Sequence, residues 1–199
     1  MTAPLPSEPL DATQRLASFR RLMRTASKFY HANPANPPLS MDIGERDVQN
    51  LLCSFNRHGV RYIVVGGFAV MLHGYPRTTQ DLDLWVESGI ENRQFLIKAL
   101  HEVGSMGAEL LRDTPLLFGW TSLRFGEGNF ELDLGEELVA FRSLDFNDCY
   151  QRALPSEFDG VAFRILHLQD LLREKRSTGR LQDLADAERL EKIALRRAE

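Results

Sequence analysis

The sequence predicts an α+β fold, in which a small mixed β-sheet has helices packed on one face and a C-terminal helical portion over it. Two observations carry this prediction. The apolar run Tyr62–Val65 has the composition of a buried strand, and two glycines, a helix-like stretch, a polar turn and a second strand at Leu82–Val86 follow it. Thr121–Phe125 and Phe130–Leu134 both alternate apolar and polar residues around turn-forming residues, as the arms of a β-hairpin do.

Length and composition suit one globular domain with small appendages. The chain has 199 residues, of which 43% are hydrophobic and 26% charged. No apolar run approaches the roughly 20 residues that a membrane helix needs, and no secretory signal is recognisable, so we expect no membrane partner and a cytoplasmic location. Cys53 and Cys149 are isolated in the sequence and are expected to be reduced thiols. The net charge of −4 argues against non-specific coating of nucleic acid.

Residues 1–40 are predicted to lie outside the core domain, as a tail, a basic amphipathic helix and a proline-rich linker. Apolar residues recur at helical spacing across Asp11–His31, and three prolines within Asn33–Ser40 favour an extended linker. The helix carries five cations with no acidic residue between them and Asp42: Arg15, Arg20, Arg21, Arg24 and Lys28. Three interpretations stay open: a packed helix with a solvated basic face, a contact for RNA or a partner, and an organelle-targeting peptide.

Residues 41–166 form the predicted core domain. Helices are expected at Glu45–His58 and Glu91–Val103, because apolar residues recur there at helical spacing and a glycine follows each stretch. Leu110–Leu117 is expected to be irregular with a short strand, and Val161–Leu166 reads as a further strand. The core domain is therefore expected to hold the whole sheet.

The two glycines and the strand after them predict a phosphate and metal site. Gly66 and Gly67 permit backbone conformations that a Cβ resists, and they admit a ligand close to the main chain. The helix that follows directs free N–H groups and its positive dipole end at an anion. Asp81 and Asp83 are two residues apart on a strand, so their carboxylates share a face and their Cα atoms lie roughly 7 Å apart. Two carboxylates beside a phosphate site indicate a divalent metal, and hard oxygen ligands suit magnesium.

The spacing of Gly66-Gly67, thirteen residues and then Asp81-Leu82-Asp83 resembles the motif of the nucleotidyltransferase superfamily, the fold of polymerase β and of aminoglycoside nucleotidyltransferases. The stretch HGYPRTTQDLDLWV is similar, more narrowly, to small prokaryotic nucleotidyltransferases that include toxins of abortive-infection and toxin–antitoxin systems. The resemblance requires a third carboxylate on a neighbouring strand. Asp133 in the alternating FELDL is the candidate, with Glu131 as the alternative. A competing interpretation is that both acids are only the solvated face of a half-buried hairpin.

Residues 167–199 are predicted to form a C-terminal portion of two helices separated at Gly179. Its residues Lys175, Arg180, Asp183 and Asp186 resemble a charged element that follows the catalytic sheet in abortive-infection-type transferases. The resemblance implies that Lys175 acts in catalysis and that Arg180 and Asp183 bind nucleotide. Arg180 could instead pair with Asp183, and the sequence does not distinguish these two roles. A generic pair of amphipathic helices would show charges here too.

The resemblance also assigns phosphate contacts to residues around the glycine turn. Gly66 and Gly67 would cradle the triphosphate, and Arg77, Thr78 and Thr79 lie in the turn just before the aspartate strand, within reach of phosphate oxygens. His73 stands at a helix end, where a histidine more often caps or packs than catalyses.

The sequence therefore predicts an enzyme, a nucleotidyltransferase that uses Mg²⁺ or Mn²⁺ to move a nucleoside monophosphate from an NTP to a hydroxyl. Asp81, Asp83 and Asp133 would hold the metals, and Asp133 could take the proton of the acceptor. By resemblance the acceptor is a tRNA end or a protein, and the chain is a toxin–antitoxin or abortive-infection component with a cognate antitoxin. Two alternatives stay open: a non-catalytic nucleotide-binding or regulatory relative, and a small-molecule transferase of the antibiotic-modifying type.

Overall fold

The structure is a computed structural model, and it describes residues 46–113, 120–127 and 129–198. The predicted N-terminal helix at 11–31 and the linker at 33–40 lie outside the described residues, as does the expected start of the first core helix at residue 45. Within the described part, helices and one mixed sheet are interspersed along the chain. The predicted α+β fold class is confirmed.

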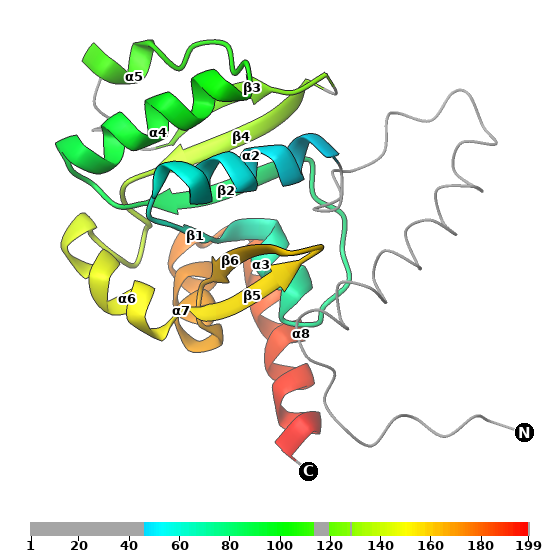
Figure 1. Ribbon diagram of the computed structural model, residues 1–199. Coiled ribbons are helices and arrows are strands. Elements are labelled where there is room, and N and C mark those ends of the chain that lie inside the picture. The colour runs from blue at the N-terminus through cyan, green and yellow to red at the C-terminus, as the bar shows by residue number, and fades with distance from the viewer. Residues whose placement is uncertain (1–45, 114–119, 128, 199) are drawn as a thin grey trace, which may run out of the picture.

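Six strands form the sheet, in the order β3-β4-β2-β1-β6-β5 (Figure 1). The strands span Tyr62–Val64 (β1), Asp81–Val86 (β2), Thr121–Phe125 (β3), Phe130–Gly135 (β4), Leu154–Phe158 (β5) and Val161–Ile165 (β6). The pairs β2–β4 and β1–β6 are parallel, whereas β1–β2, β3–β4 and β5–β6 are antiparallel. The two strands that carry the predicted aspartates, β2 and β4, are therefore direct neighbours.

The helices of the described chain are short to medium in length. They span Arg46–His58 (α2), Gly66–Leu72 (α3), Ile90–Glu102 (α4), Leu110–Asp113 (α5), Phe146–Arg152 (α6), Leu168–Thr178 (α7) and Leu181–Ala198 (α8), with a 3₁₀ turn at Ser143–Asp145. None of the helices in this part of the chain is long and apolar enough to cross a membrane.

One face of the sheet is apolar and is covered by α2 and α4 (Figure 1). Alternation along β2 and β4 places four fully buried leucines on this face, namely Leu82, Leu84, Leu132 and Leu134. Phe55 of α2 meets Tyr62 of β1 edge to face, with ring centroids 5.4 Å apart. Burial of this face against α2 and α4 fixes the register of β2 and β4, because a slip of one residue would turn the aspartates inward.

The opposite face carries the aspartates, and the described residues cover it only in part. Helix α3 begins against Asp83, and α7 and α8 lie on the same side (Figure 1). Trp85, also on this face, is fully buried and packs edge to face on Phe146 of α6, with centroids 5.3 Å apart. The C-terminal helices thus lie on the aspartate side, as expected, and α3 and α6 are further helices on that side.

Most predicted elements occur within two residues of their expected bounds, but one predicted stretch differs and two observed elements were not predicted. Leu110–Asp113, the described part of the stretch that was expected to be irregular with a short strand, is a helical turn in which the N–H of buried Leu111 donates to the Ala108 carbonyl. Residues 114–117 of that stretch lie outside the described residues. Helix α6 and strand β5 were not predicted. Pro155 weakens the strand pattern of β5, yet it is tolerated because β5 is an edge strand of the sheet that the described residues form.

Candidate functional site

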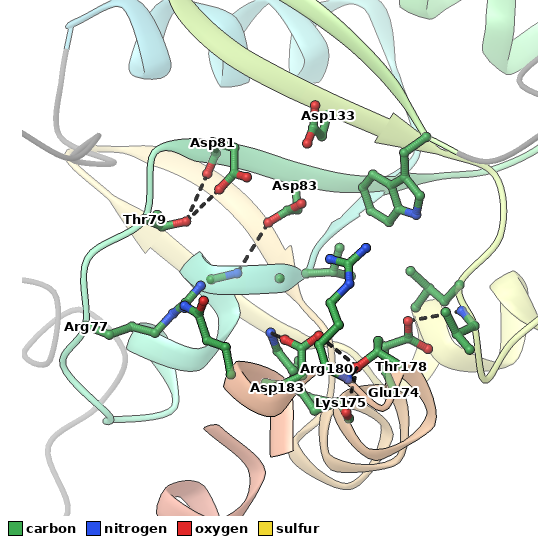
Figure 2. Close-up of a pocket in the computed structure, with 18 of the residues that line it drawn as sticks. Arg77, Thr79, Asp81, Asp83, Asp133, Glu174, Lys175, Thr178, Arg180 and Asp183 are labelled. Carbon is green, nitrogen blue, oxygen red and sulfur yellow. Dashed lines mark hydrogen bonds and ion pairs between the residues drawn. The ribbon is translucent and has the colours of Figure 1, made fainter. Parts of the chain in front are cut away.

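Three aspartates from two adjacent parallel strands form the centre of the site (Figure 2). Asp81 and Asp83 leave β2 on one face, and Asp133 leaves β4 on the same face because it is registered directly with Asp83. One carboxylate oxygen from each residue lies within 4.8 Å of the other two. Such a set of hard oxygen ligands matches what Mg²⁺ or Mn²⁺ requires.

Glu131, the alternative third carboxylate, is engaged elsewhere. It is registered with Asp81, but its Oε2 lies 3.2 Å from Nη2 of Arg124 on β3. Asp133 instead accepts a hydrogen bond from the Ser122 hydroxyl and belongs to the aspartate cluster. The geometry therefore favours Asp133, and its part in binding a metal stays a prediction.

Gly66 and Gly67 have no side chains, and the room this leaves is occupied by the side chains of Asp83 on β2 and of Thr79 and Arg77 in the loop before it. Gly66 has a φ of 56°, in the left-handed region, and a Cβ there would lie 1.8 Å from Asp83 Oδ2. A Cβ on Gly67 would lie 2.4 Å from Thr79 Oγ1 and 2.5 Å from Arg77 Nη2. The Gly67 N–H donates to Asp83 Oδ2 at 3.3 Å. Both glycines thus position protein groups, in addition to any contact with a phosphate.

Asp83 is held in an environment that disfavours its charge. Its pKa is raised to about 7, first by burial and next by the charge of Asp81, with a smaller contribution from Asp133. The Gly67 N–H and the Lys175 ammonium act in the opposite direction. A divalent cation among the three carboxylates would offset this repulsion, so the donor set fits magnesium in charge as well as in ligand type.

A cleft of about 590 Å³ opens beside the aspartates. Every residue that the sequence assigned to the site lines this cleft: Gly66, Gly67, Arg77, Thr78, Thr79, Asp81, Asp83, Asp133, Lys175, Arg180 and Asp183. They come from the first turn of α3, the loop before β2, the strands β2 and β4, and the α7–α8 pair. The fold therefore brings together residues that are up to 117 positions apart, from Gly66 to Asp183.

Lys175 of α7 is buried and is held by two aspartates of α8. Its Nζ forms an ion pair with Asp183 Oδ1, and lies 3.2 Å from Asp186 Oδ2. The other oxygen of Asp183 accepts from the Thr178 hydroxyl at 2.8 Å. Burial opposes the charge of Asp183, but hydrogen bonds from Lys175 and Thr178 outweigh it and lower its pKa. Asp183, which we expected to bind nucleotide, thus has one oxygen paired with Lys175 and the other hydrogen-bonded to Thr178.

The loop before β2 contributes a second cation. The Arg77 side chain is largely buried, with Nη1 3.7 Å from Asp186 Oδ2, and its Nε has no hydrogen-bond partner among the described residues. Thr79 is also buried and donates from Oγ1 to Asp81 Oδ1 at 2.7 Å. Thr78 and Arg180 are exposed at the cleft. Arg77 and Arg180 therefore offer N–H donors to an anionic ligand, whereas Thr79 orients Asp81.

His73 does not reach the cleft lining. It caps the end of α3, is buried, and its Nε2 lies 2.8 Å from the carbonyl oxygen of Leu166. This is the packed, helix-end position that a lone histidine was expected to take.

Several residues at the site were not assigned to it from the sequence. Asp186 belongs to the charged element named from the sequence but was given no role there, although it lies three positions from Asp183 on one helix and so shares its face. No local sequence pattern marks three other cleft residues, Glu174, Thr178 and Trp120. They reach the cleft only because of how α7, β3 and the loop after β4 meet.

Comparison with known proteins adds no family to these observations. No protein-family model matches the chain, and no curated protein matches it either. The function must therefore be argued from the cleft itself and from the motif residues that line it.

Proposed function

We propose that the chain is a nucleotidyltransferase that binds an NTP and a divalent cation in the cleft and transfers the nucleoside monophosphate to an acceptor hydroxyl. One observation supports this most strongly. Asp81, Asp83 and Asp133 present oxygens within 4.8 Å of one another in a cleft that the cations Lys175, Arg77 and Arg180 also line. Clustered carboxylates and cations facing one cleft suit a polyphosphate bound together with a metal. The resemblance of the Gly66–Asp83 motif to nucleotidyltransferases supports the same function.

In this function the three aspartates would hold Mg²⁺ or Mn²⁺, which when bound supplies neutralisation of charge at the reacting phosphate. Arg77 and Arg180 would donate N–H groups to the phosphate oxygens. Lys175 would place a positive charge next to Asp83. Because Asp183 and Asp186 already hold its side chain, Lys175 would lose little side-chain entropy when the nucleotide binds.

The transfer step needs a proton acceptor as well as an electrophile. The acceptor oxygen attacks the α-phosphorus, the bond from this phosphorus to the β-bridging oxygen breaks, and pyrophosphate leaves with that electron pair. In this proposal the triphosphate binds at the glycine turn, and Asp133 lies on β4, on the opposite side of Asp83. The acceptor hydroxyl approaches from that opposite side, so Asp133 accepts its proton. Ser122 orients the Asp133 carboxylate through a hydrogen bond to Oδ1.

The acceptor class is part of the proposal. By the motif's resemblance we propose a macromolecular acceptor, a tRNA end or a protein, and a cytoplasmic toxin–antitoxin or abortive-infection role with a cognate antitoxin as partner. The rival functions are a nucleotide-binding regulator without turnover and a transferase for small hydroxylated antibiotics.

Incubation with each NTP labelled at the α-phosphate tests the proposal. The wild-type chain, Mg²⁺, total RNA, total protein and a hydroxylated aminoglycoside are combined, and the products are separated by class. We expect label in RNA or protein with wild type and none with Asp83→Asn. Asp148→Asn is the matched control, because Asp148 is an exposed aspartate on α6 that does not line the cleft.

The outcomes separate the candidate functions. Label in the aminoglycoside would favour the small-molecule transferase. NTP binding without label in any acceptor would favour the regulator. A wild-type chain that neither binds an NTP nor transfers label would contradict the proposed function altogether.

A further inference from the structure

The cleft has two chemically different ends, set by the direction of β2 and β4. At the amino end of β2 lie Asp81 and the loop that carries Arg77. At the carboxyl end β4 finishes at Gly135, which is registered with Trp85 of β2. Among the described residues, the cleft lining at this second end includes the carboxylate of Glu174 and four apolar residues: Trp120, Leu138, Val139 and Leu171. Figure 2 shows Arg77 and Glu174 at opposite sides of the cleft.

Trp120 precedes β3, packs against Gly135 at the end of β4, and lines the same cleft as the aspartates. A Cβ on Gly135 would lie 2.9 and 3.0 Å from atoms of the indole ring, so the absence of a side chain at Gly135 allows the ring to cover that backbone. The antiparallel register pairs Ser122 with Asp133, and therefore puts position 120 two residues further along the same face. The Trp120 side chain nevertheless remains 40% exposed and lines the cleft.

The loop after β4 forms the other apolar part of this end. Glu174 accepts hydrogen bonds from the N–H groups of Val139 at 3.0 Å and Ala140 at 2.7 Å. Arg173 lies over the ring of Phe141, 4.6 Å from its centroid. Two side chains of α7 thus fix this loop, although Val139 itself is 63% exposed at the cleft. An exposed aromatic ring packed against Gly135 and an exposed valine whose N–H is bonded to Glu174 indicate a surface prepared for an apolar, planar group.

We propose that this end of the cleft is a nucleobase subsite in which the Trp120 indole is the stacking surface and Val139 borders the base. The inference rests on the proposed function, which supplies nucleobases as the ligand class. A base is the one planar, largely apolar part of a nucleotide, and stacking on an aromatic side chain tolerates every base. We assign the base to the NTP, because an NTP whose base stacks on Trp120 can extend its phosphates past Asp83 toward Arg77. The terminal base of an RNA acceptor is the second possible source.

Binding measurements on the full chain test this subsite without relying on turnover. Each NTP, tripolyphosphate and a short single-stranded oligoribonucleotide are titrated separately with Mg²⁺ into wild type, Trp120→Ala, Trp120→Phe and Leu144→Ala. Leu144 is a 93% exposed apolar residue outside the cleft lining, and so it controls for the loss of a surface side chain. Because the sequence holds two tryptophans and Trp85 is fully buried, quenching of fluorescence by a stacked base reports on Trp120.

We expect Trp120→Ala to bind NTP about 5- to 150-fold more weakly, with tripolyphosphate affinity unchanged. Trp120→Phe should bind NTP within a few-fold of wild type but lose the quenching, and Leu144→Ala should match wild type. A selective loss of oligoribonucleotide affinity would support the subsite with the acceptor as the source of the base. NTP and oligoribonucleotide affinities that are both unchanged in Trp120→Ala would overturn the subsite while leaving the proposed function intact. If wild type binds neither NTP nor tripolyphosphate, the proposed function fails and the subsite fails with it.

Discussion

Asp83 lies where burial, Asp81 and Asp133 together raise the pKa of its carboxyl group to about 7. An unfolded aspartate has a pKa near 4, so over the range between these values the folded chain keeps a proton that the unfolded chain has lost. Asp83 therefore contributes stability below about pH 4, and this contribution is lost as the pH rises to about 7. Within that window, each rise of one pH unit lowers the free energy of unfolding of the metal-free chain by at most about 1.4 kcal/mol through Asp83.

The pH dependence of unfolding should show this directly. We expect metal-free wild type to lose stability relative to Asp83→Asn as the pH rises from 5 to 8, because an asparagine cannot ionise. Mg²⁺ should restore wild-type stability most strongly at pH 8, since it replaces the proton among the carboxylates. Urea unfolding in chelator and in Mg²⁺ measures both effects. Parallel pH profiles for wild type and Asp83→Asn would show that Asp83 is not perturbed.

Asp133 and Glu131 differ by two positions on β4, and the geometry distinguishes their roles. Asp133→Asn should abolish transfer and weaken the stabilisation by Mg²⁺ with NTP, because it removes one of three clustered carboxylates. Glu131→Gln should retain activity, since it breaks only an exposed contact to Arg124 worth less than about 1 kcal/mol. Initial rates and thermal shifts measure the pair. Loss of activity in Glu131→Gln alone would mean that the wrong carboxylate had been assigned.

At the scale of elements, the turn from β1 into α3 is the most constrained part of the site. Gly66→Ala should lower stability by about 1–3 kcal/mol and also abolish Mg²⁺-dependent stabilisation, because the new Cβ would displace the Asp83 carboxylate. Gly59→Ala is the matched control, with a φ of 73° and no atom within 4 Å of the added Cβ. It should cost only about 1–2 kcal/mol and leave metal binding unchanged. Equal effects of the two substitutions on metal binding would argue against a steric role for Gly66.

Local periodicity was sufficient to predict the elements that hold the aspartates, but not all others. The β1–α3–β2 unit and the β3–β4 hairpin have apolar patterns that match their observed strands and helix. Strand β5 was missed because Pro155 lowers its apparent strand propensity, although an edge position tolerates it. Helix α6 is only seven residues long, which is too short for a periodic signal to stand out.

At the scale of the whole molecule, the cleft depends on contacts that no local pattern contains. The three carboxylates could be assigned to one site from the sequence because Asp81 and Asp83 share a strand, and Asp133 lies in a strand whose apolar and acidic residues alternate. The contact of Glu174 with the Val139 and Ala140 amides spans 35 and 34 positions, and the packing of Trp120 on Gly135 requires the hairpin register. Likewise, Asp183 binds Lys175 because α8 folds back on α7 at Gly179, whose φ is 68°.

The N-terminal segment is the largest part of the chain whose role the cleft does not explain. If its five cations contact RNA phosphates, deletion of residues 1–40 should weaken RNA binding and reduce the slope of log affinity against log salt by about 0.7–0.9 for each lost contact. Binding of NTP and metal should persist, since all the cleft-lining residues in the described part of the chain lie at Val65 or beyond. Binding titrations at several salt concentrations and thermal melts measure both properties.

The alternative roles of this segment give different results. A lower melting temperature with an unchanged salt slope would indicate that the helix packs on the domain. A truncated chain with unchanged stability and an unchanged salt slope would exclude both roles and leave a tether or a targeting sequence.

The central claim is that the cleft transfers the α-phosphate of an NTP together with its nucleoside, and the position of the label decides it most directly. The same NTP is supplied with label at the α- or at the γ-phosphate, together with Mg²⁺ and the acceptor fraction, and both acceptor label and released pyrophosphate are measured. We predict that α-label enters the acceptor in a one-to-one ratio with released pyrophosphate, and that γ-label appears only in pyrophosphate. We also predict that Asp81→Ala and Asp83→Ala neither label the acceptor nor release pyrophosphate. Transfer of γ-label to the acceptor, or undiminished transfer in either aspartate variant, would contradict the assignment.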